Sequence, residues 1–80
     1  MKNFLAYFIT TPVTPTLHDL TLLVGTARAG FERNTEQEPT HAFVSVNVSF
    51  PAGIETISGL TLVQDTSFRG PRLGVGILVD

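Results

Sequence analysis

The sequence predicts a small α+β domain, a mostly antiparallel four-stranded sheet with one helix, in the order strand, helix, strand, strand, strand. Three observations predict it. Four segments have the composition of strands, the segment that begins near residue 17 repeats its apolar residues with helical spacing, and proline or glycine separates the segments. Eighty residues correspond to a single domain, residues 1–80. An all-β sandwich or small barrel is the alternative if segment 17–31 is a strand.

Residues 4–9, FLAYFI, predict the first strand. Both of its alternating sets of side chains are apolar, which is typical of a strand covered on both faces, so we expect it near the centre of the sheet. Pro12 and Pro15 end this strand because proline donates no hydrogen bond to a neighbouring strand.

Segment 17–31 favours a helix. At about 100° per residue, one arc of about 120° holds its larger apolar residues, namely Leu17, Leu20, Leu23, Val24, Ala27 and Phe31. Thr16 is the expected N-cap, with Asp19 three residues later as in a capping box. Arg28 falls in the expected last turn and Gly30 at the position that follows the helix. The same segment also alternates as a strand would, and the central Gly25 weakens the helix.

Residues 41–50 give the clearest strand pattern. One face is apolar and is expected to be buried, with Ala42, Val44, Val46, Val48 and Phe50. The other face is expected to meet solvent, with Phe43, Ser45, Asn47 and Ser49. Pro51 ends the strand, and residues 51–53 predict a turn.

Two more strands are expected before the chain ends. Residues 54–65 predict a strand that a bulge at Ser58-Gly59 interrupts, and residues 73–80 predict the last strand after a turn at Gly70-Pro71. The short links predict antiparallel hairpins among the last three strands. Glycine repeated on one face of the last strand indicates that the helix or another chain approaches it closely.

Few residues in the chain suit chemistry. It has no cysteine and two histidines, which argues against a disulfide, a thiolate metal site or a histidine-rich metal site. His18 and Asp19 are adjacent, but neighbours on a helix point about 100° apart, so we interpret Asp19 as a helix N-terminal anion and His18 as a surface residue. His41 is interpreted as a turn residue. We therefore expect no enzyme, no catalytic residue, no metal and no cofactor.

The net charge of −2 and five scattered basic residues make a nucleic-acid partner an unfavoured prediction. No segment approaches the ~20 apolar residues of a membrane span, and we expect a cytoplasmic protein that contacts no membrane. Only 15% of the residues are charged, against about 25% in a typical domain, which suits a surface covered by another chain.

These observations predict a non-catalytic protein-interaction module, a regulator or inhibitor of the size found in phage or mobile-element genomes, which acts through a sheet face or edge on a protein partner or on itself as a homo-oligomer. The expected partner contacts are Arg69, Arg72, Gly74, Gly76 and Phe43. In this hypothesis the two arginines flank a turn and hold an anionic group of the partner. A structural, self-assembling virion or tail subunit and a weak nucleic-acid binder are the alternatives.

Overall fold

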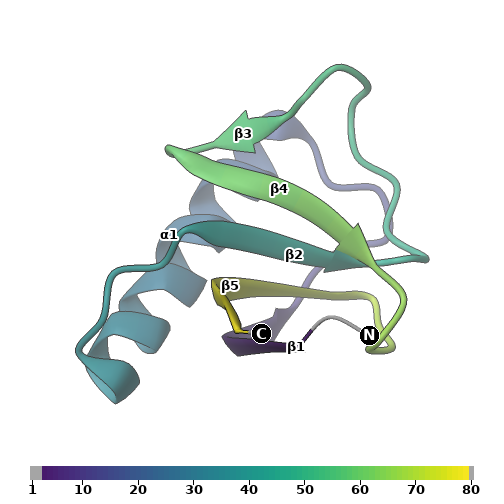
Figure 1. The fold of residues 1–80 in the computed structure, drawn as a ribbon. Helices are drawn as coiled ribbons and strands as arrows, with labels where there is room; N and C mark the ends of the chain where they lie inside the picture. The colour runs from purple at the N-terminus through teal and green to yellow at the C-terminus, as the bar shows by residue number, and fades with distance from the viewer. Residues whose placement is uncertain (1–2, 80) are drawn as a thin grey trace.

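The computed structural model describes residues 3–79, which form one helix packed on one face of a five-stranded sheet (Figure 1). Along the chain the elements are β1 (Asn3–Thr10), α1 (Leu17–Thr35), β2 (His41–Ser45), β3 (Thr56–Ile57), β4 (Leu60–Asp65) and β5 (Arg72–Val79). The order in the sheet is β1-β5-β2-β4-β3, where β2 and β4 are parallel and the other three pairs are antiparallel. The α+β class is confirmed, but the sheet has five strands instead of four. Asp80, which we assigned to the last strand, lies outside the described residues.

The helix prediction is confirmed, and so is its start. Thr16 Oγ1 accepts the Asp19 amide at 3.0 Å, and Asp19 Oδ2 accepts the Thr16 amide at 3.0 Å, which completes a capping box. The predicted end is wrong. The helix continues past Gly30 to Thr35, and Glu36 takes the left-handed conformation with φ of 57°. Gly30 is buried in the helix instead, because the ring of Tyr7 lies directly against it.

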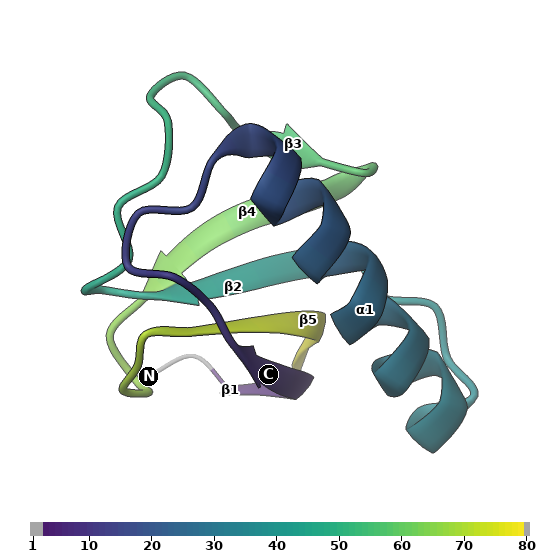
Figure 2. The same ribbon diagram turned by 180° about the vertical axis from the view of Figure 1, so that it is seen from behind.

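The core lies between α1 and the sheet (Figure 2). From the helix it takes Leu20, Val24 and Ala27, and from the strands it takes Ala42, Val44, Ile57, Leu60, Leu73 and Val75. Most of the predicted helical arc is therefore buried, whereas Leu17 at its start is 53% exposed. Half-buried Tyr7 and Ile9 of β1 pack against the same core.

The strand predicted over residues 41–50 is shorter than expected. β2 ends at Ser45, and Val46 and Asn47 form a turn in which the Val48 amide donates to the Ser45 carbonyl at 3.1 Å. Val46 is consequently 59% exposed, not buried. Phe43 and Ser45, which we expected to meet solvent, are fully buried. β2 lies between β5 and β4, and on the face that its sequence suggested was open, Gly70 of the β4–β5 loop lies against the Ser45 side chain.

The predicted interruption at Ser58-Gly59 is confirmed, but it is a turn and not a bulge. Both residues have positive φ, 51° and 81°, and Ile57 pairs with Leu60 across them, so the chain reverses in a two-residue hairpin turn. This turn divides the expected single strand into β3 and β4. β3 and β4 form a hairpin, but β2, β4 and β5 do not follow one another as hairpins, because β2 and β4 run parallel and β5 inserts between β1 and β2.

Candidate interaction surface

β1 lies at an edge of the sheet, where we had predicted a central strand. Tyr7, Ile9 and Phe8 are nevertheless at least partly covered, on the two faces of the sheet. On one face Tyr7 and Ile9 pack against the core. On the other face Phe8 contacts Phe68 of the β4–β5 loop, with ring centroids 4.6 Å apart. Coverage of the two faces therefore comes from the helix and a loop, and within residues 3–79 β5 is the only strand paired with β1.

The direction of the β1 backbone groups follows from its register with β5. The pairing continues without a bulge from Asn3 opposite Val79 to Thr10 opposite Arg72, and the next amide, Thr11, donates to the Pro71 carbonyl at 3.3 Å. Bonded and non-bonded positions alternate in an antiparallel pair. Odd-numbered residues of β1 thus point their amides and carbonyls toward β5, and even-numbered positions such as Ala6 and Thr10 point theirs outward. We call this outward side of Asn3–Thr10 the β1 edge.

The β1 edge lacks the charge, the proline, the short length and the bulge by which many proteins protect an edge strand. Neither a charged side chain nor a proline occurs between Asn3 and Thr10, the strand is eight residues long, and it pairs without a bulge. Leu5, a residue of this strand, is 44% exposed. The opposite edge differs, because β3 has two residues and leaves little backbone for a partner strand.

Of the five predicted contact residues, three are buried by the chain itself. Phe43 is 0% exposed, and the His41 ring stacks on it with centroids 5.9 Å apart. A Cβ atom added to Gly74 would lie 2.5 Å from two carbons of the Phe8 ring, and one added to Gly76 would meet the β1 backbone at Leu5 and Ala6. The close approach that the two glycines indicate is real, but β1 makes it, where we expected the helix or another chain.

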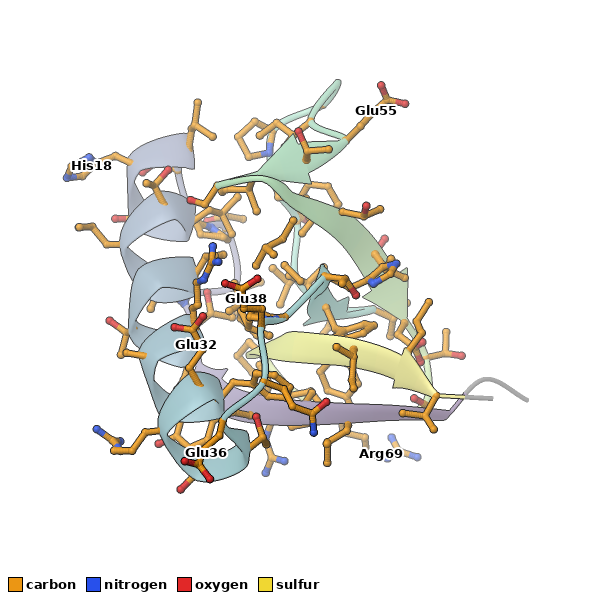
Figure 3. The ribbon with its side chains drawn as sticks, turned by 60° about the vertical axis from the view of Figure 1, so that its left-hand side comes forward. His18, Glu32, Glu36, Glu38, Glu55 and Arg69 are labelled. Atoms are coloured by element: carbon orange, nitrogen blue, oxygen red, sulfur yellow. The ribbon has the colours of Figure 1, made fainter. Side chains whose placement is uncertain are left out.

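The two arginines, unlike those glycines, are exposed on the surface. Arg69 lines a cleft of about 580 Å³ at the end of the sheet, together with Val46, Asn47, Thr66, Ser67, Phe68 and Gly70. Arg72 begins β5 opposite Thr10 and is exposed. In Figure 3 Arg69 lies at the β1 side of the sheet. This position agrees with the contact between its neighbour Phe68 and Phe8 of β1. That the arginines contact a partner stays a prediction.

The titratable groups have structural roles. Hydrogen bonds from the backbone and side chain of Thr16 lower the pKa of Asp19 below its ordinary value of 3.8, so this carboxylate caps the helix. His18 is exposed and points away from the sheet (Figure 3). His41 Nδ1 lies 2.7 Å from the Thr40 hydroxyl. Among residues 3–79 no three metal-ligating side chains come together, and no helix there has the length and apolarity to span a membrane.

Sequence reasoning missed a second apolar area, at the start of α1. Val13 and Leu22 are 51% and 59% exposed, and Pro12, Asp19, Leu22 and Leu23 line a small cleft of about 170 Å³. The sequence did contain one sign of this area, because Leu22 is a large apolar residue outside the helical arc that was predicted to be buried.

Comparison of the chain with protein-family models, curated proteins and solved structures finds no match. The functional argument therefore depends on the geometry of the β1 edge and of the surfaces around it.

Proposed function

We propose that this protein is a non-catalytic interaction module that binds a protein partner by adding a strand to the β1 edge. The observation that carries the proposal is the uncharged, unbulged, eight-residue edge strand. In strand addition, backbone hydrogen bonds supply affinity and alternate side chains supply specificity. Here the outward backbone groups of Ala6 and Thr10 would bond the incoming strand, and Leu5 would contact its side chains.

The edge supports this function better than the sheet face opposite α1. That face is occupied by the chain's own residues, because the Phe8 ring lies on Gly74 and Phe68 lies against Phe8. Phe43 offers no exposed ring to a partner or to a nucleic-acid base. A partner on this face would have to displace the β4–β5 loop, whereas a strand at the β1 edge would pair with backbone groups that already point outward. Because the chain has no cysteine, we propose the reducing cytoplasm as its location.

Strand addition is tested by hydrogen–deuterium exchange over residues 3–10 in the presence of an extended peptide of about eight alternating valine and threonine residues. The expected result is slower exchange of the outward amides, Ala6 and Thr10 among them. The matched control is the same peptide N-methylated at every residue, which has no amide to donate from either edge and should give no protection. Fast exchange of the outward amides of residues 3–10, both with the peptide and at every concentration of the protein, would show that the edge binds no strand.

A further inference from the structure

We propose that the strand added at the β1 edge is β1 of a second copy, paired antiparallel about a two-fold axis so that two five-stranded sheets join into one. This inference rests on the proposed function and names its partner. A two-fold pairing uses the same surface of both copies, so that surface must be complementary to itself.

The alternation of the backbone groups limits the register. Outward-pointing positions must face outward-pointing positions, so an even-numbered residue of one copy lies opposite an even-numbered residue of the other. The two-fold axis then lies midway between the two copies of one residue, which face each other. Near the middle of β1 that residue is Ala6, which aligns residues 3–9 of the two copies (the Ala6 register), or Tyr7, which aligns residues 4–10 (the Tyr7 register).

Both registers keep each face of the joined sheet consistent. Side chains on the helix side of β1 meet helix-side chains of the second copy, because opposite residues share a face. Leu5, 44% exposed in one chain, would lie opposite Tyr7 of the second copy in the Ala6 register and opposite Ile9 of the second copy in the Tyr7 register. Either register covers the apolar side chain that one chain leaves partly in water.

Charge permits this self-pairing. β1 carries no charged residue between Asn3 and Thr10, so antiparallel copies bring no like charges together across the seam. The net charge of −2 gives two chains little long-range repulsion. A partner selected through charge would need a charged residue beside the ladder, and β1 offers none to guide it.

The size of the domain and its second edge favour a closed pair. An 80-residue chain without disulfides buries a modest core, for which self-association is a common supplement. After two copies join, each outer edge of the enlarged sheet consists of β3, of two residues, and the few residues of β4 that β3 does not pair. These edges are too short to continue the ladder, so the assembly should stop at a dimer.

The first test is the mass of the protein by size-exclusion chromatography with light scattering, from about 5 μM to about 500 μM, which brackets moderate to weak association. We expect a mass that rises to twice the 8.6 kDa of one chain. The Leu5→Lys variant should raise the Kd about tenfold or more, because pairing would bury an ammonium group. The matched control is Leu22→Lys, which changes an exposed leucine of α1 by the same charge and should leave the Kd unchanged.

The second test places a cysteine in the seam, which is clean because the chain has none. Ala6→Cys should be joined between chains by a cross-linker of about 8 Å in either register, since directly opposite and diagonal neighbours both lie within that reach. Direct oxidation to a disulfide should succeed in the Ala6 register alone, where the two Cα atoms lie about 5.5 Å apart. Thr56→Cys on β3 is the control and should remain monomeric.

A monomer at every concentration, or equal cross-linking of the two cysteine variants, overturns the dimer. If the extended peptide still protects residues 3–10 in that case, strand addition stands and the partner is another protein. If both the peptide and self-association fail, the proposed function fails with the dimer. Larger assemblies would show that a second surface also pairs, which contradicts a closed two-fold dimer.

Discussion

The two glycines of α1 allow a matched test of how the helix meets β1. A Cβ atom added at Gly30 would lie 2.5–2.7 Å from three carbons of the Tyr7 ring, well inside the ordinary contact distance of about 3.5–4.0 Å. At Gly25, on the same helix, nothing lies within 4 Å of the added atom. Replacement by alanine therefore has the same effect on helix propensity at both positions, but it disturbs the packing against Tyr7 at Gly30 alone.

The expected magnitudes follow from two opposing effects. Alanine in a helix interior is favoured over glycine by about 1 kcal/mol, and this gain applies at both positions. Forcing a methyl group into a packed site costs about 1–3 kcal/mol, and this cost applies to Gly30 alone, because the aromatic ring cannot bend away. Gly25→Ala should thus raise the free energy of unfolding by about 1 kcal/mol, whereas Gly30→Ala should change it by between about 0 and −2 kcal/mol.

Urea unfolding followed by circular dichroism measures this difference. At a slope of about 1 kcal/mol per M, the midpoints of the two variants should differ by about 1–3 M. Protein concentration must be the same in each experiment, because association of folded chains would shift every midpoint. If Gly30→Ala stabilises the protein as much as Gly25→Ala does, the contact between Tyr7 and the helix is not as the structure describes it.

Four further predictions concern the sheet and the helix cap. Gly76→Ala should destabilise the fold more than Gly74→Ala, because its methyl group meets the backbone of β1 and not an aromatic ring; thermal melting of the two variants orders them. The pKa of Asp19 is lowered in the fold, so its carboxylate should stabilise the protein above about pH 4, and this stabilisation should be lost as the pH falls through the folded pKa. The urea unfolding midpoint of Asp19→Asn should lack this part of the pH dependence. Thr16→Ala removes the other half of the cap and should cost about 1 kcal/mol at neutral pH in urea unfolding. Ser45→Ala removes the acceptor of the Arg72 amide, a part-buried hydrogen bond, and should lower the free energy of unfolding by about 1 kcal/mol, whereas no measurable loss would contradict that hydrogen bond.

The sequence predicted local structure well where a local signal existed. The helix start was found because Thr16 and Asp19 cap it through their own side chains, three residues apart. The helix end was missed because Gly30 has two physical uses. Glycine can leave a helix in the left-handed conformation, but it can also admit a neighbouring ring, and the sequence of the helix does not include Tyr7.

The candidate site was missed for a related reason. Alternation of apolar residues reports whether the two faces of a strand are covered, but it says nothing of whether another strand lies at each edge. In β1 the helix covers one face and the β4–β5 loop covers the other. This edge strand therefore has apolar residues on both faces, as a central strand would. The same ambiguity affected β2, where the turn at Val46 and Asn47 replaced the second half of a regular alternation.

Gly74 and Gly76 bear on the incorrect placement of β1 in the sheet, because they help to explain how β5 comes to lie between β1 and β2. Gly76 lets the backbone of β1 approach, and Gly74 leaves space for the Phe8 ring on the face opposite α1. With side chains at both positions, β1 would be held away from β5, and the loop residue Phe68 would lose its contact with Phe8. The two glycines thus specify that β1 pairs with β5 on its inner side. They leave its outer side as the longest unpaired strand edge among residues 3–79, which is why we place the binding surface there and not on the glycines.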